Sequence, residues 1–157
     1  MQFEIPAPSQ TFEVPLDDGA RIRMRRHGNP NGVRLLVTHG NGFAADAYYP
    51  YWRHLLAKFD LLVFDFRNHG QNDPVEPSNH HYAQLSRDLE RVVKDVDARL
   101  GRKKTAGIFH SMSARTAMKH AIEIGWRWDA LVLFDPPDVP PREHPQYAAM
   151  EIGRAHV

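Results

Sequence analysis

The chain has 157 residues, enough for one globular domain, and its 42% hydrophobic and 25% charged residues are ordinary for soluble proteins. Its net charge of +1 argues against a polyelectrolyte partner such as nucleic acid, and the lack of cysteine excludes disulfides and thiolate metal sites. No apolar run approaches membrane-spanning length and no signal peptide is recognisable, so the sequence predicts a soluble, cytoplasmic protein without a membrane partner.

Two strands are predicted first, over residues 11–14 and 20–26, joined by "PLDDG" in an antiparallel hairpin. The second strand contains the basic run "RIRMRR", whose alternation indicates a solvated arginine face and not a nucleic-acid site. A third strand is predicted at 33–39, because "VRLLVTH" is a short apolar run rich in branched side chains.

The pattern then alternates between helices and strands. Apolar residues at helical spacing from Tyr48 to Phe59, with Pro50 in the first turn, predict a helix. Further buried strands are predicted over 60–66, 104–110 and 130–135, and further helices over 82–100 and 112–124. Alternating strands and helices indicate crossover connections. The predicted fold class is therefore α/β, a doubly wound, mostly parallel sheet that starts with an antiparallel hairpin.

In such sheets, functional residues gather in the loops at the carboxyl ends of the strands. The third predicted strand ends in "THGNGF", the fourth in "DFRNHGQND" and the fifth in "FHSMSA". In this order, and with the expected elements between them, these loops resemble those of the α/β-hydrolase fold family over residues 10–138. The resemblance implies a hydrolase that acts on a small-molecule substrate and uses no cofactor.

Ser111 stands at the apex of the predicted strand-to-helix turn, where its hydroxyl would project from the sheet towards the N–H groups of a helix N-terminus. The resemblance implies that Ser111 is the nucleophile of a serine hydrolase acting on an ester or related acyl bond. It also implies an oxyanion hole formed by the backbone N–H groups of Asn41 and Met112, with Gly40 beside them. A serine before a helix is by itself more often an N-cap, and the upstream "HGNGF" is what favours the nucleophile.

The turn departs from the family pattern G-x-S-x-G, because Phe109 and Ser113 occupy the two small positions. Ser113 is an easy replacement, and Gly107 is expected to help accommodate the ring of Phe109. His39 and His110 are expected to support the loops, and "RNHG" is expected to be structural. The ten histidines show no H-E-x-x-H or similar spacing, so no metal site is predicted.

The catalytic partners of the serine are expected to lie beyond this sequence. By resemblance, the order along the chain is serine, then acid, then histidine. Asp135 is a candidate acid at a strand end, and Asp138 lies near it. The downstream histidines are His120, His144 and His156, and none of them stands at the position expected for the base.

We therefore expect the sequence to be incomplete after its sixth strand. Residues 1–138 would be the N-terminal part of the core, and 139–151 would begin a cap or lid. Residues 152–157, "IGRAHV", resemble the translation of a common short-read sequencing adapter. Such a fragment is expected to be inactive.

Two alternatives remain open at this point. One is a carbon–carbon bond hydrolase that uses the same triad. The other is a non-catalytic binding module in which Phe109 distorts the turn. The sequence leaves the oligomeric state undetermined, and it contains no G-x-G-x-x-G motif to indicate nucleotide binding.

Overall fold

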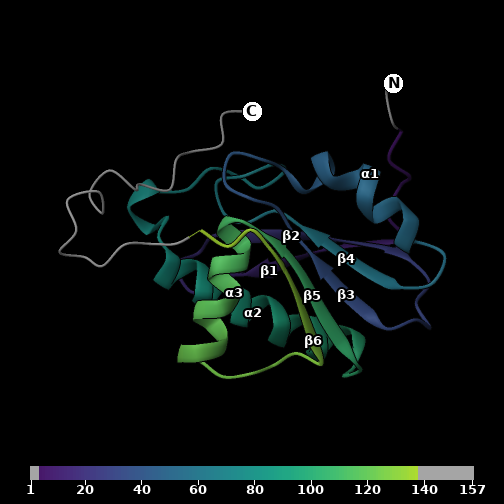
Figure 1. Cartoon of the computed structure of the whole chain (residues 1–157). Coiled ribbons are helices and arrows are strands. Elements are labelled where there is room, and N and C mark those ends of the chain that lie inside the picture. Colours follow the sequence, from purple (N-terminus) through teal and green to yellow (C-terminus); the bar gives the residue numbers. More distant parts are fainter. Residues whose placement is uncertain (1–3, 138–157) are drawn as a thin grey trace.

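The predicted hairpin forms at the start of the chain. In the computed structural model, which describes residues 4–137, β1 (Gln10–Pro15) and β2 (Arg21–Gly28) pair antiparallel (Figure 1). The remaining strands are β3 (Arg34–Val37), β4 (Asp60–Phe64), β5 (Thr105–His110) and β6 (Ala130–Phe134). The order in the sheet is β1-β2-β4-β3-β5-β6, and every pairing from β4 to β6 is parallel. The predicted α/β class with a mostly parallel sheet is confirmed.

Helices cover both faces of this sheet (Figure 1). On one face lie α2 (Tyr82–Leu100) and α3 (Met112–Glu123), as predicted. The other face carries η1 (Ala45–Tyr48), α1 (Tyr49–Trp52) and η2 (Arg53–Leu55), and a further single turn, η3 (Pro77–Asn79), precedes α2.

The prediction of one continuous helix from Tyr48 to Phe59 is wrong in extent. Only Tyr49–Trp52 is α-helical; Arg53–Leu55 is a 3₁₀ turn, and after it the N–H of Lys58 donates to the carbonyl of Leu55 (3.1 Å). Hydrogen bonds that span three residues tighten the chain, so helical spacing of the apolar side chains does not extend into a regular α-helix.

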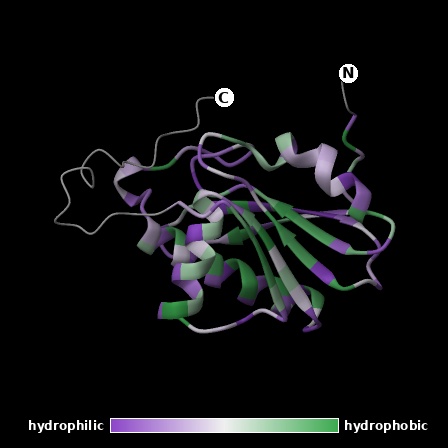
Figure 2. Ribbon diagram, viewed as in Figure 1, coloured by the Kyte–Doolittle hydropathy of each residue, from purple (hydrophilic) through white to green (hydrophobic). Residues whose placement is uncertain are grey.

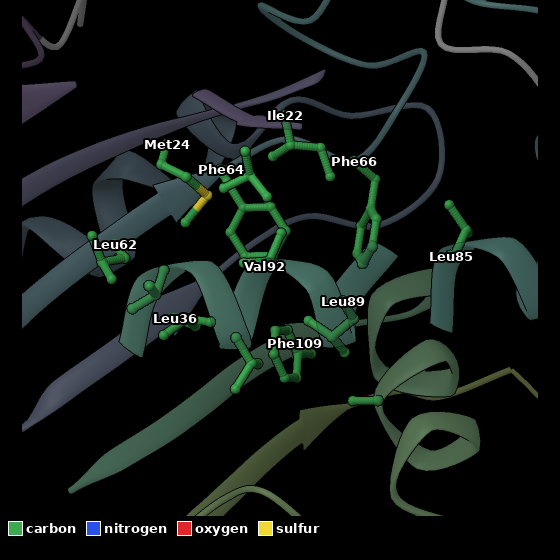
Figure 3. Close-up of a cluster of buried hydrophobic side chains, with 14 of the residues drawn as sticks. Ile22, Met24, Leu36, Leu62, Phe64, Phe66, Leu85, Leu89, Val92 and Phe109 are labelled. Carbon is green, nitrogen blue, oxygen red and sulfur yellow. The ribbon is translucent and has the colours of Figure 1, made fainter. Parts of the chain in front are cut away.

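The larger core lies between the sheet and the α2–α3 layer. The apolar stripe predicted for α2 packs there against alternate residues of the strands (Figure 3). The side chains labelled in the figure are Ile22, Met24, Leu36, Leu62, Phe64, Phe66, Leu85, Leu89, Val92 and Phe109. Successive residues of a strand face opposite sides of the sheet. The strand residues that alternate with those of the larger core therefore form a second core on the other face.

The second, smaller core lies between the sheet and α1, where Trp52 is buried against Leu61 and Val63 of β4. The solvated arginine face expected on β2 is confirmed for Arg21 and Arg23, which are exposed, but not for Arg25. Arg25 is only 5% exposed, because its guanidinium is covered by Asp46 of η1, with which it pairs. Alternation along a strand identifies a face but does not show what covers it.

Strand β6 lies at the edge of the described sheet, bonded to β5 on one side. Leu131 and Leu133 pack on the larger core, whereas Val132 and Phe134 on the opposite face are 44% and 54% exposed. The parallel strands β3 to β6 are predominantly apolar along their length (Figure 2). An apolar edge strand fits the expectation that further chain follows in the sheet.

Candidate active site

Ser111 occupies a tight turn between β5 and α3, as the sequence predicts. Its backbone angles are φ 50° and ψ −113°, a region in which a side chain is strained. The turn is held because the Ser111 N–H donates to the carbonyl of Phe134 (2.8 Å). The Ser113 hydroxyl accepts from the His110 N–H (2.9 Å) and donates to the His110 carbonyl (3.0 Å). The Ser111 side chain makes no capping hydrogen bond, so the ordinary N-cap role does not apply to it.

The "HGNG" loop after β3 lies directly against this turn. A Cβ atom on Gly40 would stand 3.2 Å from the Cβ of Ser111 and 2.7 Å from Nδ1 of His110, so only glycine allows so close an approach. The Gly40 N–H already donates to the Tyr48 hydroxyl (3.1 Å). Met112 is the first residue of α3, so its N–H has no intrahelical acceptor. Asn41 follows Gly40 in the same loop.

His39 holds this loop from within the protein. Its Nε2 accepts from the Phe66 N–H (3.0 Å), so its proton is on Nδ1, which donates to the Gly40 carbonyl (2.8 Å). Burial lowers the pKa of His39 to about 4, so the ring is neutral at physiological pH. Because a trans peptide directs its N–H opposite to its C=O, the Asn41 N–H points away from His39. His39 thus supports the loop after β3, as expected from the sequence.

A second set of supports comes from the loop after β4, where the sequence predicted a structural role for "RNHG", which includes His69, but none for Asp65. Asp65 accepts from the N–H groups of Ala45 (2.6 Å) and Gln71 (3.3 Å). His69 accepts from the Gly42 N–H at Nε2 (3.4 Å). These side chains join the loops after β3 and β4. The sequence feature that indicates them is the position of "DFRNHG" directly after the end of a predicted strand.

Arg67 in the same loop is structural, as expected for "RNHG". It is 1% exposed and forms paired hydrogen bonds with Asp88 of α2, of 2.6 and 2.8 Å. A third bond of 2.6 Å reaches Asp18 in the hairpin turn. One buried guanidinium therefore ties the hairpin, the loop and α2 together.

Other candidates are not brought to the serine. Within residues 4–137, no hydrogen bond joins the Ser111 side chain to a histidine or carboxylate. His120 instead pairs through Nε2 with Glu90 of α2 (2.8 Å), pointing away from the turn as expected. Asp135 is exposed at the end of β6, with φ 47°. Asp138, His144 and His156, and the segments 139–151 and 152–157, lie outside the described residues.

Two further features of the described chain bear on its class. No helix within residues 4–137 has the length and apolar character needed to cross a membrane. In the same range, no three histidine or acidic side chains converge in a way that would hold a metal ion.

Comparison with known proteins gives the family. The model of the Alpha/beta hydrolase family matches residues 35–156. No curated protein sequence gives a significant match. The fold is similar to that of N-formylmaleamic acid deformylase from Pseudomonas putida, with 22% identity, a TM-score of 0.70, and coverage of 87% of this chain and 50% of that one.

Two other solved structures give the same result. An esterase from Rhodococcus sp. has 23% identity, a TM-score of 0.66, and coverage of 78% of this chain and 44% of that one. A hydrolase from Pseudomonas aeruginosa has 22% identity, a TM-score of 0.66, and coverage of 80% and 45%. The chain thus spans about half the length of these proteins, in accordance with the expected N-terminal part of such a domain. Since the family match extends over more than half of its residues, the chain belongs to the α/β hydrolase family.

Proposed function

We propose that this chain is the N-terminal part of a cytoplasmic serine hydrolase that cleaves an ester or related acyl bond of a small molecule, with Ser111 as the nucleophile. The observation that carries the proposal is the conformation of Ser111. It has a strained positive φ of 50°, no capping hydrogen bond, and the Gly40 loop packed against its Cβ. Strain of this kind is retained where the surrounding structure imposes it, which is common at active sites.

In the proposed reaction, the Ser111 oxygen attacks the substrate carbonyl while a base removes its proton. The carbonyl oxygen becomes an anion, which the N–H groups of Asn41 and Met112 would stabilise. Loss of one such donor typically lowers the rate by about a hundred- to a thousandfold. Gly40, whose own N–H is engaged by Tyr48, contributes close approach rather than a donor.

The base, and an acid to orient it, are needed because a serine hydroxyl is a weak nucleophile by itself. Asp135 remains a candidate acid at the end of β6, and we place the histidine in the part of the protein that follows. The 157 residues alone would be nearly inactive. A hydrolase that lacks a member of its triad typically retains only about a thousand- to ten-thousandfold acceleration over water.

The direction of the Phe109 side chain favours a catalytic protein over a binding module. Phe109 is fully buried in the larger core, 5.4 Å between ring centroids from Trp128, and so does not obstruct the turn. The esterase and the deformylase among the similar structures support an acyl bond as the target. Cleavage of a carbon–carbon bond next to a carbonyl would use the same groups, and the substrate tests below separate it from ester hydrolysis.

The experiment starts by reading the source DNA past codon 151 and expressing the whole reading frame. The protein is treated with a fluorophosphonate, which labels activated serines, and assayed on aryl esters and on a diketone. We expect Ser111→Ala to abolish labelling and turnover. Ser78→Ala, which changes an exposed serine before α2, should leave both unaffected. A frame that ends at Val157, or labelling that persists in Ser111→Ala, would refute the proposal.

A further inference from the structure

The hydroxyl of Tyr48 lies between the two segments that the proposed reaction must hold together. Tyr48 is the last residue of η1, 8 positions after Gly40 and 62 positions before His110. Its oxygen accepts from the Gly40 N–H (3.1 Å) and lies 2.6 Å from Nδ1 of His110, the residue before Ser111. Its ring is tilted against that of His110, with centroids 5.6 Å apart.

The hydrogen-bonding capacity of a phenol fixes the direction of these bonds. Burial raises the pKa of Tyr48, so the hydroxyl keeps its single proton at neutral pH. The Gly40 N–H can only donate, so the tyrosine oxygen accepts that bond; within residues 4–137 His110 Nδ1 is the one acceptor beside the hydroxyl, which donates its proton there. Nδ1 of His110 is then the acceptor and carries no proton.

The loop around Asn41 depends on hydrogen bonds to hold it in place. Gly40 and Gly42 flank Asn41, and a glycine has no side chain through which packing could restrain the backbone. The restraint must therefore come from hydrogen bonds. His39 holds the Gly40 carbonyl, and Tyr48 holds the Gly40 N–H, so both peptide groups of Gly40 are fixed.

We propose that Tyr48 is a positioning residue that sets the distance between the Asn41 N–H and Ser111. His39 orients the Asn41 N–H, but Tyr48 also reaches the serine turn through His110, and so it fixes the two halves of the oxyanion site relative to each other. The inference rests on the proposed function. A displacement of about 1 Å in such a site can reduce the rate by about a hundredfold.

The kinetic test uses the enzyme expressed from the whole reading frame. Tyr48→Phe removes one oxygen and keeps the ring. We expect kcat to fall by about 10- to 100-fold with KM within about threefold of the wild type, since substrate contacts are unchanged. The matched control is Tyr51→Phe, which removes the same atom from a side chain 77% exposed and should leave kcat unchanged. His110→Asn, which keeps an acceptor close to the place of Nδ1, should retain more activity than His110→Leu.

A second measurement uses the 157-residue chain and needs no activity. In ¹⁵N-resolved NMR spectra, His110 should show an unprotonated Nδ1. Tyr48→Phe should shift the amide signals of Gly40, Asn41 and Met112, and Tyr51→Phe should not. The inference is overturned if these signals do not move in Tyr48→Phe, or if kcat stays within twofold of the wild type. Full activity in Ser111→Ala would instead refute the proposed function, so the two failures are distinguishable.

Discussion

Gly107 lies against the ring of Phe109: a Cβ atom at residue 107 would stand 2.3 Å from Cε2 of Phe109 and 2.8 Å from Cδ2 of Leu131. Both neighbours belong to the larger core or pack against it, so neither can move away easily. The expectation that Gly107 accommodates the aromatic ring is therefore confirmed. The small residue that the family pattern has two places before the serine is found here four places before it.

We predict that Gly107→Ala destabilises the fold by about 1–3 kcal/mol, the usual cost of overpacking a core. Phe109→Ala alone should cost about 3–5 kcal/mol, through the cavity that it leaves. The double variant should cost less than the sum, because the methyl group at residue 107 then occupies part of that cavity. Urea denaturation of the three variants measures the coupling, and strictly additive losses would show that the two residues are not in contact.

Ser111 provides a test of backbone strain. Ser111→Ala keeps a Cβ atom at φ 50°, whereas Ser111→Gly removes it. Relief of strain at such a position contributes about 1–3 kcal/mol, against about 0.5–1 kcal/mol of extra chain entropy that glycine loses on folding. The glycine variant should thus unfold at a higher urea concentration than the alanine variant. If the alanine variant is the more stable of the two, the turn is not strained.

Arg67 and Arg21 form ion pairs that differ in burial. The Arg67–Asp88 pair is 1% exposed on both sides, whereas the Arg21 side chain is 69% exposed beside Glu13. Arg67→Met should destabilise by about 3–5 kcal/mol, because it leaves the buried Asp88 carboxyl without its partner. Arg21→Met should change the stability little, since exposed pairs are screened by solvent. Equal losses in thermal unfolding would contradict this explanation.

The strands and the longer helices could be predicted because each depends on a local repeat of apolar residues. The stripe on α2, from Tyr82 to Leu100, is one example, and the buried run of β4 is another. The strand-to-helix turn at Ser111 could be placed because its pattern is also local. The burial of Arg25, in contrast, depends on Asp46 of η1, which is 21 positions away in the sequence. No local repeat of residues indicates a contact of this kind.

The sequence indicated supporting roles for His39, His110 and "RNHG", but their contacts could not be predicted, for the same reason. Tyr48 and His110 are 62 positions apart, and Gly42 and His69 are 27 apart. Tyr48 could be read only as one apolar position of a helix, since nothing near it in sequence indicates what its hydroxyl contacts. The resemblance drew attention to these loops and to the serine, but it indicated neither Tyr48 nor the partner of each supporting histidine.

Three imidazoles form a row beneath the site: the ring centroids of His39 and His69 are 4.6 Å apart, and those of His69 and His80 are 5.2 Å apart. Burial lowers the pKa of all three, to about 4 for His39 and His80. Among the groups that face them, Asp65 favours protonation and Arg67 opposes it. The unfolded chain would bind protons near pH 6.5, so stability is fully present above that pH and is lost as pH falls towards 4.

His80 is the position at which this acid sensitivity can be removed. Both of its ring nitrogens are buried without a hydrogen-bond partner. No hydrogen bond therefore offsets the free-energy cost of removing these polar atoms from water. We predict that His80→Phe stabilises the fold at pH 7. We also predict that it lowers the slope of unfolding free energy against pH by about 1.4 kcal/mol per unit between pH 6 and 4, the share of one proton. Urea titrations at several pH values measure both effects.

His54→Gln, at an exposed histidine outside the row, should leave the slope unchanged. A slope that is the same in His80→Phe and in the wild type would mean that His80 is protonated in the folded protein and has no part in its acid sensitivity.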